Sequence, residues 1–299
     1  MFYREAAMQQ IPEWLSNKIK EEYVADSEQI LNGFSVSRPV SLRVNRLKTD
    51  PAEVKAELNR NGIAYREVVW YADALILESA TERDIRALSL YERGEIYLQS
   101  LSSMLPPLFL DGQAGENILD MAAAPGGKTA QISALSLGGA FITACEIDRI
   151  RTDRLRFNLA RQGVPRVTVL QTDARKLNEF FSFDRILLDA PCSGSGTLDL
   201  SASIKISEAL VRNSVSIQEA LLCKALKLLK KNGTLVYSTC SILKEENEEV
   251  LFRALRRCGG ELIPISPPTG IPVLPSADGT LCVSPDELFE GFFVAKIQK

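Results

Sequence analysis

The sequence predicts an α/β fold, in which a small α+β domain precedes a larger domain built on a mostly parallel sheet. The first observation is that, from about residue 118, short apolar segments alternate with longer segments of helical periodicity. The second is that the preceding part mixes helix and strand patterns without this alternation. Alternating strands and helices are typical of a sheet covered by helices on both faces. A chain of 299 residues suits two domains, and we predict them at 1–105 and 106–299.

The first domain is predicted to begin with helix and to continue as a small α+β unit. Ile11, Leu15 and Ile19 recur at a spacing of four, which places them on one helix face within about the first 35 residues. Asp50 and Pro51 have the residue types of an N-cap and a first helical position, so another helix is expected from there to about residue 58. Strands of this domain are expected at 39–45, 68–70 and 74–77.

The second domain is predicted to alternate strands with helices. Its strands are expected at 117–121, 140–145, 167–171, 185–188, 234–238, 261–265 and 292–297. Its helices are expected at about 128–137, 149–162, 207–230 and 244–257. The proline-rich segment from 264 to 275 is expected to be mostly loop.

The composition is that of an ordinary globular protein, with 45% hydrophobic and 24% charged residues. No apolar run approaches the ~20 residues that a membrane span needs, and the N-terminal segment has no signal-peptide core. We therefore expect a cytoplasmic protein that does not associate with membranes. The net charge of −3 argues against a uniformly basic nucleic-acid-binding surface and leaves room for a local basic patch.

The absence of histidine restricts the chemistry most strongly. It excludes Ser-His-Asp and Cys-His catalysis and every metal site with a histidine ligand. Catalysis in this chain must therefore use carboxylates, lysine, cysteine, tyrosine or backbone groups, and we expect no metal.

The six cysteines form no CxxC pair, and we expect free thiols because the chain shows no secretory signal. Most buried cysteines act as small hydrophobic residues, and we assign that role to Cys145, Cys223, Cys258 and Cys282. Cys192 and Cys240 differ from these, because each lies in a polar turn directly after a predicted strand.

A glycine-containing turn follows the first strand of the second domain and opens a helix. Its small residues, from Ala122 to Lys128, allow a ligand to approach the backbone closely. The turn is neither GxGxxG nor the phosphate-binding GxxxxGK[ST]. The next three strands end at Glu146, Asp173 and Asp189. This set suits a neutral nucleoside with a positively charged amino-acid tail, and it suits a pyrophosphate poorly.

The two polar cysteine turns follow the fourth and fifth strands of this domain. They read Asp189-Ala-Pro-Cys-Ser-Gly194 and Ser238-Thr-Cys-Ser241. Ligands of open α/β sheets bind outside the carboxyl ends of the strands. If the two strands are neighbours, Cys192 and Cys240 face one pocket beside the glycine turn.

These motifs resemble those of the Sun-type (Nol/Nop/Sun) family of RNA 5-methylcytosine methyltransferases. The resemblance extends from about Arg38 to the C-terminus. Besides the two cysteine turns, its elements are Pro39-Val-Ser-Leu-Arg-Val-Asn45, Gly94-Glu-Ile-Tyr-Leu-Gln-Ser100, Asp120-Met-Ala-Ala-Ala-Pro-Gly-Gly-Lys-Thr129 and Gly291-Phe-Phe293. The strings AAPGGKT, DAPCSG and STCS in this order are highly specific.

The resemblance implies a seven-stranded, Rossmann-like methyltransferase core that depends on S-adenosylmethionine, preceded by a small RNA-binding domain. The residues that it places around the cofactor are Ala122, Ala123, Ala124, Pro125, Gly126, Gly127, Lys128, Glu146, Arg151, Asp173 and Asp189. It further implies that Cys240 is the nucleophile, that Cys192 assists release, and that Lys128 reaches the active site.

The expected chemistry follows from the low nucleophilicity of carbon 5 of cytosine. A thiolate that adds to carbon 6 gives an enamine-like intermediate whose carbon 5 can attack a methyl sulfonium. An acid that stabilises ring nitrogen 3 helps this addition, and Asp189 follows the fourth strand at a suitable place. A base must afterwards remove the carbon-5 proton so that the thiol can leave, and Cys192 is the candidate.

The expected partner is a structured RNA, with ribosomal RNA as first choice and transfer RNA as second, and the protein is expected to be a monomer. Arg38, Arg43 and Arg46 form a locally basic stretch that we predict to bind RNA. A second basic stretch, from Arg149 to Arg161, is more simply explained as a solvated helix face.

Two segments depart from the pattern of the family. After DAPCSGSG the family often has a basic residue, a proline and a tryptophan, which the segment 197–206 lacks. Before the final Gly-Phe-Phe the family often has Pro-His, which is missing from 280–290. Both segments are expected to border the substrate, so the departures concern target identity.

Three alternatives stay open at this point. A catalytically silent RNA-binding protein with the same fold is disfavoured by the intact Cys192, Cys240 and Asp189. A nicotinamide oxidoreductase is disfavoured by the missing GxGxxG. A methyltransferase acting on DNA or protein is the third, because the DNA enzymes usually take their nucleophile from a Pro-Cys after strand four, and Cys192 occupies such a position.

Overall fold

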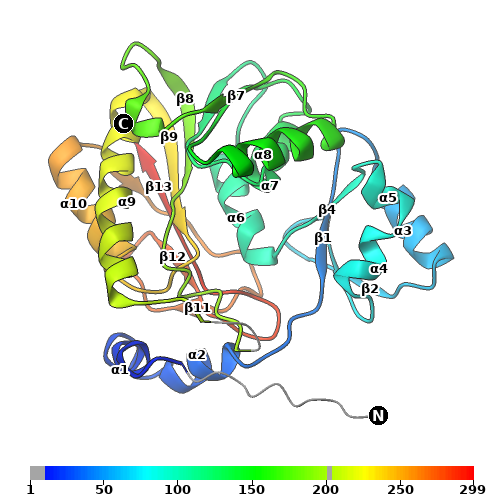
Figure 1. Cartoon of the computed structure of the whole chain (residues 1–299), viewed down its shortest axis with the longest axis horizontal. Helices are drawn as coiled ribbons and strands as arrows, with labels where there is room; N and C mark the ends of the chain where they lie inside the picture. Colours follow the sequence, from blue (N-terminus) through cyan, green and yellow to red (C-terminus); the bar gives the residue numbers. More distant parts are fainter. Residues whose placement is uncertain (1–10, 201–203) are drawn as a thin grey trace.

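The computed structural model describes residues 11–200 and 204–299 and contains two β-sheets that lie side by side (Figure 1). The smaller sheet has the order β2-β3-β1-β4, and the larger has the order β11-β12-β13-β9-β8-β5-β6-β7 with β10 paired to β13. The predicted combination of a small α+β domain and a large α/β domain is confirmed.

The small sheet is antiparallel throughout. Its strands are β1 (Ser41–Val44), β2 (Tyr65–Glu67), β3 (Ala74–Leu77) and β4 (Ile96–Leu98). Its helices are α3 (Pro51–Arg60), α4 (Glu82–Arg86) and α5 (Ser89–Glu92). The Asp50 side chain accepts hydrogen bonds from the backbone N–H groups of Ala52 and Glu53, as predicted for an N-cap. The prediction of a strand at 68–70 is wrong. The Val68 carbonyl accepts a turn hydrogen bond from the Tyr71 N–H, and strand β2 ends just before this turn, at Glu67.

The two N-terminal helices belong to the core of the large domain rather than to the small sheet. They are α1 (Glu13–Glu22) and α2 (Ser27–Gly33), and Figure 1 shows them below the large sheet, away from β1 to β4. The buried side chains of Leu15, Ile19 and Tyr23 share one apolar cluster with Tyr237 and Phe293. Leu15 and Ile19 therefore share the inward face of α1 as predicted, whereas Ile11 precedes the helix and packs, partly buried, against the same cluster. The part of the helical prediction that covers residues 1–10 lies outside the described residues.

Five neighbouring strands of the large sheet run parallel, as the sequence predicts. They are β5 (Asn117–Asp120), β6 (Phe141–Glu146), β7 (Val167–Gln171), β8 (Phe183–Asp189) and β9 (Leu229–Thr239). Strand β13 (Phe292–Gln298) pairs with β9 in the antiparallel direction and with β10 (Glu261–Ile263) on its other side. Two short strands absent from the prediction, β11 (Val273–Leu274) and β12 (Leu281–Val283), extend the sheet.

Helices cover both faces of this sheet. Those predicted from periodicity are α7 (Gly127–Leu135), α8 (Arg149–Gln162), α9 (Glu208–Leu228) and α10 (Glu248–Cys258), and a short 3₁₀ helix η1 (Ala174–Lys176) follows β7. Helix α6 (Leu101–Leu110) is not predicted, because Pro106 and Pro107 lie inside it and it is apolar on almost every side.

The position of α6 bears on the domain boundary. Its residues Leu101, Met104 and Leu105 pack in one cluster with Ile118 and Val236 of the large sheet. The boundary expected between residues 105 and 106 falls inside this helix. We therefore propose that the larger domain begins at about Leu101 and also includes α1 and α2.

One prediction about the cysteines is wrong. Cys223 of α9 and Cys258 of α10 form a disulfide, with their Cα atoms 5.6 Å apart. The helices pack against each other, which brings together two residues that are 35 positions apart in the sequence. Cys145 and Cys282 are free and buried, as expected.

Within the described residues, no helix combines the length and apolar character required to cross a bilayer.

Candidate active site

The site lies where β5, β6, β8 and β9 end, at the carboxyl edge of the parallel strands. Strands β8 and β9 are direct neighbours, and their register places Asp189 opposite Ser238. The sequence predicts that Cys192 and Cys240 meet only if these two strands are neighbours, and they are. Cys192 lies three residues beyond Asp189, and Cys240 lies two residues beyond Ser238.

Cys192 and Cys240 are in direct contact, with their Sγ atoms 2.9 Å apart. Both thiols are partly exposed and free. The hydrogen bond to Cys240, together with burial and the nearby charge of Glu246, raises the pKa of the Cys192 thiol well above its usual range. Cys192 therefore holds its proton at neutral pH and can donate it in a hydrogen bond to Cys240.

Lys128 and Asp189 form an ion pair beside the two cysteines. The Lys128 Nζ lies 2.7 Å from an Asp189 carboxylate oxygen and donates a hydrogen bond of 2.7 Å to Ser103 Oγ. Burial alone would lower the pKa of Lys128, but the charges of Asp189, Cys240 and Asp120 raise it above its usual value. The ammonium group is therefore held charged in the site. The second oxygen of Asp189 accepts a hydrogen bond of 2.8 Å from Ser238.

A cleft of about 220 Å³ opens beside this ion pair, between the two sheets. One wall comes from the segment that joins β4 to α6, and the other comes from the glycine turn and the end of β8. The lining residues are Tyr97, Leu98, Gln99, Ser100, Ser103, Asp120, Ala122, Ala123, Ala124, Pro125, Gly127, Lys128 and Asp189. The predicted glycine turn thus lines one cavity together with Lys128 and Asp189, whereas Cys192 and Cys240 are not among the residues that line it.

The glycine turn has the backbone conformation that its sequence suggests. Gly126 adopts a φ of 105° at the N-cap of α7, where a β-carbon would also meet Leu155 at 3.0 Å. Asp120, just before the turn, accepts a hydrogen bond of 2.6 Å from Thr129. Burial raises the pKa of Asp120 to about 6.

Glu146 and Arg151 lie together at the end of β6. The Glu146 side chain is 3% exposed, and its carboxylate lies 3.6 Å from the Arg151 guanidinium. Arg151 also donates a hydrogen bond of 3.0 Å to the carbonyl of Ala124 in the glycine turn. Asp173 follows the neighbouring strand β7, where its carboxylate caps η1 and pairs with Arg175 at 2.7 Å. With Asp189 at the end of β8, the predicted cofactor-binding residues therefore come from four adjacent strand ends.

The three arginines predicted to bind RNA have different environments. Arg43 is fully buried and donates hydrogen bonds to Gln99, to the Gly127 carbonyl and to Gln162. The prediction that Arg43 binds RNA is therefore wrong, because this side chain fastens β1 to the glycine turn and to α8. Arg38 uses its guanidinium to bond the carbonyls of Gly33 and Phe289. Of the three, only Arg46, 39% exposed, has a largely free side chain, which lies 3.7 Å from Asp73.

Gly196 and Gly291, which border the two segments that depart from the family pattern, meet next to Cys240. The Gly196 N–H donates to the Cys240 carbonyl at 3.0 Å, and the Gly291 N–H donates to the Gly196 carbonyl at 2.8 Å. A β-carbon on Gly196 would lie 2.1 Å from the Gly291 carbonyl oxygen, so only glycine fits there. The described part of 197–206 and the segment before Gly291 therefore both start from the active site.

Several polar residues of the site were missed from the sequence. Ser103 lies on the unpredicted helix α6, and its hydroxyl bonds Lys128. Glu246 follows Cys240 by six residues and bonds the Ser193 backbone and hydroxyl. A lone serine or glutamate has no spacing signal of its own, so only the folded chain reveals these contacts.

The donor set fits a nucleoside that carries an amino-acid tail. The glycine turn exposes backbone to the cleft, and a buried carboxylate stands at the end of the next strand. Lys128, the lysine that lines the cleft, is already paired with the Asp189 carboxylate and bonded to Ser103, and these carboxylates would repel a pyrophosphate. The cleft therefore agrees with S-adenosylmethionine and disagrees with a dinucleotide.

Comparison with known proteins points in the same direction. A family profile described as "16S rRNA methyltransferase RsmB/F" matches residues 107–298. A second profile, the RsmF/B-like ferredoxin-like domain, matches residues 11–84.

Two curated relatives illustrate the similarity. The 25S rRNA (cytosine-C(5))-methyltransferase nop2 of Schizosaccharomyces pombe is 35% identical over 82% of this chain and 42% of its own length. The probable ribosomal RNA small subunit methyltransferase B of Bacillus subtilis is 32% identical over 96% of this chain and 66% of its own length. The chain thus spans less than two thirds of each of these relatives.

Among solved structures, a methyltransferase homolog protein from Pyrococcus horikoshii superposes with a TM-score of 0.85. It is 34% identical, and the match covers 97% of this chain and 95% of that one. NSun6 from the same organism, at 23% identity and a TM-score of 0.88, shares the fold. The two profiles, the curated relatives and the superposition agree, and the chain belongs to the RsmB/F family of 16S rRNA methyltransferases.

Proposed function

We propose that this protein transfers a methyl group from S-adenosylmethionine to carbon 5 of a cytosine in ribosomal RNA. The observation that carries the proposal is the contact between Cys192 and Cys240, 2.9 Å apart at the ends of neighbouring strands. The Lys128–Asp189 ion pair and the glycine turn lie beside it. A structural cysteine pair would not need a buried cation, a carboxylate and a ligand cleft at the same place.

The cleft is proposed to hold S-adenosylmethionine, which supplies an electrophilic methyl group when bound. Glu146 has the position and charge to accept hydrogen bonds from ribose hydroxyls. Arg151 ties Glu146 to the carbonyl of Ala124, which keeps the glycine turn and the carboxylate in a fixed relation. Asp173 is proposed to contribute from the next strand end, at the side of η1.

Cys240 is the proposed nucleophile. Its thiolate adds to carbon 6 of the cytosine, which forms a sulfur–carbon bond and moves the ring electrons toward carbon 5 and nitrogen 3. With the cofactor bound, carbon 5 would take the methyl group from its sulfonium, and the methyl–sulfur bond would break to leave a neutral thioether. Asp189 is proposed to deliver a proton to ring nitrogen 3 during this addition, and the charged Lys128 beside it stabilises the carboxylate that is left.

Cys192 is the proposed base of the second half of the reaction. Its thiolate accepts the proton of carbon 5, the double bond between carbons 5 and 6 forms again, and the bond from carbon 6 to Cys240 breaks. The raised pKa of Cys192 favours this assignment over the reverse one. A thiol that holds its proton is a poor nucleophile, and a thiolate of high pKa is a strong base.

The substrate class is proposed from the relatives, whose names specify ribosomal RNA. Ribosomal RNA is therefore preferred over transfer RNA. Bisulfite sequencing of total RNA from cells with and without the gene tests this choice. Loss of one unconverted cytosine from ribosomal RNA is expected, and loss from transfer RNA alone would contradict the ribosomal assignment.

The cysteine roles are tested with two variants. Cys240→Ala is expected to lose both methylation and the covalent RNA adduct. Cys192→Ala is expected to form the adduct and to keep it, because the carbon-5 proton is not removed. The assays use total RNA from cells lacking the gene, methyl-labelled S-adenosylmethionine and denaturing gels. Normal turnover in Cys240→Ala would overturn the mechanism and would favour Cys192 as nucleophile.

A further inference from the structure

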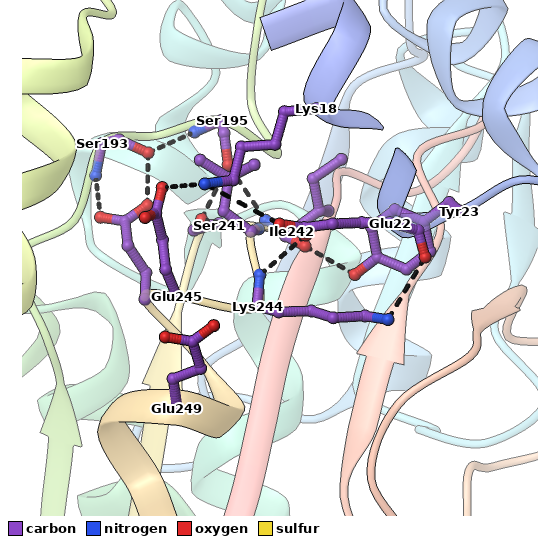
Figure 2. Close-up of polar contacts among 12 residues, drawn as sticks. Lys18, Glu22, Tyr23, Ser193, Ser195, Ser241, Ile242, Lys244, Glu245 and Glu249 are labelled. Atoms are coloured by element: carbon purple, nitrogen blue, oxygen red, sulfur yellow. Dashed lines mark hydrogen bonds and ion pairs between the residues drawn. The ribbon is translucent and has the colours of Figure 1, made fainter. Parts of the chain in front are cut away.

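The segment that follows Cys240, residues 241–249, lies between two other parts of the molecule and bonds both of them (Figure 2). On one side, Tyr23 donates a hydrogen bond of 2.6 Å to the Ile242 carbonyl, and the Glu22 carboxylate accepts one of 3.0 Å from the Lys244 N–H. On the other side lies the turn of Ser193 and Ser195 that follows Cys192, as Figure 2 shows. This segment therefore contacts the turn of the proposed base as well as carrying the proposed nucleophile.

Glu246 makes the strongest of these contacts. Its carboxylate accepts a hydrogen bond of 2.7 Å from the Ser193 backbone N–H and one of 2.5 Å from the Ser193 hydroxyl. Its side chain is 0% exposed. The partners found for this carboxylate in the described part of the chain are neutral donors, with Gln218 Nε2 as the third at 3.3 Å. Burying a carboxylate costs desolvation free energy. Charge-assisted hydrogen bonds offset that cost only while the distances between the carboxylate and its donors are maintained.

These contacts fix the backbone on both sides of Cys192. The peptide after it is held by Glu246 through the Ser193 N–H. The peptide before it is held by Gln218, which donates a hydrogen bond of 3.0 Å to the Pro191 carbonyl. Gln218 also bonds Glu246, so the two anchors are joined to each other. The position of the Cys192 thiol therefore depends on this pair.

The carboxylate is itself fixed relative to Cys240. The Glu246 carbonyl accepts a hydrogen bond of 2.6 Å from the hydroxyl of Tyr237, which lies three residues before Cys240 on β9. Ser195 and Ser241 add a second link between the two cysteine turns, with their hydroxyl oxygens 2.7 Å apart. Any movement of Glu246 would therefore change the separation of the two thiols.

We propose that Glu246 is a positioning residue for the release step, whose carboxylate holds the Cys192 turn so that its thiol stays against Cys240. The proposal rests on the function proposed above, in which Cys192 removes the carbon-5 proton. Within the described residues, the carboxylate and the carbonyl of Glu246 bond Ser193, Gln218 and Tyr237, none of which lines the cleft, so Glu246 acts through the turn of Cys192. Loss of this carboxylate should therefore impair release more than it impairs attack by Cys240.

The test compares Glu246→Ala with Cys192→Ala, using total RNA from cells lacking the gene and methyl-labelled S-adenosylmethionine. Two quantities are measured, the turnover rate and the fraction of enzyme linked to RNA on a denaturing gel. Glu246→Ala is expected to lower turnover about 10- to 100-fold, as misplacement of a catalytic group does, and to accumulate the adduct as Cys192→Ala does. A purely structural residue would lower turnover and adduct together.

Two further variants separate hydrogen bonding from charge and from general damage. Glu246→Gln can keep all three contacts if the Ser193 hydroxyl turns round, so it is expected to stay within about threefold of the wild-type turnover. Glu245→Gln is the matched control at the next position. Its carboxylate pairs with Lys18 at 2.5 Å on a partly exposed face, and its loss should leave turnover and adduct unchanged.

Wild-type adduct levels in Glu246→Ala, while Cys192→Ala traps the adduct, would overturn the positioning role. A Glu246→Gln variant as impaired as Glu246→Ala would also overturn it, in favour of a charge effect. If Cys192→Ala itself traps nothing, the proposed function fails instead. If Glu246→Ala does not fold, Ser193→Ala is the substitute, because it removes only the hydroxyl donor to Glu246. This variant is expected to accumulate a few-fold more adduct than the wild type. No accumulation of adduct in Ser193→Ala would contradict the proposal.

Discussion

At the residue scale, the site shows how a chain without histidine arranges acid–base chemistry. Two thiols of the same intrinsic acidity stand 2.9 Å apart in different surroundings. Cys192 is held against its neighbour and close to the buried Glu246, and these interactions with burial raise its pKa. Cys240 stands near the charged Lys128. Environment rather than residue type separates the proposed base from the proposed nucleophile.

The raised pKa of Cys192 gives a prediction about pH. Below that pKa, the thiolate fraction rises about tenfold with each pH unit, so removal of the carbon-5 proton should accelerate from pH 7 to pH 9. In the free enzyme the hydrogen bond to Cys240, burial and the charge of Glu246 raise this pKa; in the adduct Cys240 is a thioether, so burial and Glu246 are the causes that remain. Decay of a preformed adduct after a pH jump measures the step directly.

The control for this experiment is Cys192→Ala, whose adduct should decay slowly and with little dependence on pH. A wild-type adduct that decays at the same rate from pH 7 to pH 9 would show that another group is the base.

At the scale of elements, strand ends determine which residues meet. Parallel strands β5, β6 and β8 carry the glycine turn, Glu146 and Asp189 to one edge of the sheet. The neighbouring pair β8 and β9 does the same for the two cysteine turns. These motifs are far apart in the sequence, and the pairing of their strands in the sheet brings them close together in space.

Helices α9 and α10 are joined by the disulfide between Cys223 and Cys258, far in sequence from the glycine turn. In the loop-entropy description, a cross-link across 35 residues stabilises the fold by about 4 kcal/mol. Cys258→Ser is therefore expected to lower the free energy of unfolding by a few kcal/mol, within the usual range of about 2–4. Urea titration of the wild-type and variant proteins measures this difference.

The turnover rate of Cys258→Ser is the control for this stability measurement. Both bonded cysteines lie outside the cleft between the sheets, so turnover at 25 °C should match that of the wild type. Equal unfolding midpoints in urea would mean that the bond contributes nothing to the native state.

At the scale of the whole molecule, the two domains are joined through buried polar contacts. Arg43 of β1 bonds the carbonyl of Gly127, and Asn45 bonds the carbonyls of Gly94 and Gln162. Arg43, one of the three arginines of the predicted basic stretch, therefore holds the small sheet against the glycine turn. The C-terminal end of α1, through Glu22 and Tyr23, holds the segment that follows Cys240.

This arrangement changes the expected charge contribution to RNA binding. Arg46→Glu is expected to weaken RNA binding and to flatten the slope of log K against log salt by about 0.7–0.9 for each phosphate that is no longer neutralised. Arg43→Lys should leave that slope unchanged and should lower the melting temperature, because its partners are inside the protein. Filter binding across a salt titration, with thermal unfolding of each variant, distinguishes the two effects. An unchanged slope for Arg46→Glu would remove this arginine from the RNA interface.

The sequence by itself was sufficient for the α/β class, the glycine turn, the three strand-end carboxylates and the two cysteine turns. These features depend on local patterns: apolar periodicity, glycine where φ is positive at Gly126, and motif strings of contiguous residues. The Asp50 cap belongs to the same class, since an N-cap bonds residues two and three positions away.

Only the tertiary structure decided the rest. The burial of Arg43, the Cys223–Cys258 bond, the attachment of α1 and α2 to the large domain and the contact of Glu246 with Ser193 join residues 35 or more positions apart, or residues from different domains. Such contacts depend on how elements pack, and side-chain type alone does not encode which distant group a buried arginine or glutamate will meet. The physical reason is that local preference acts over a few residues, whereas burial and pairing are properties of the complete fold.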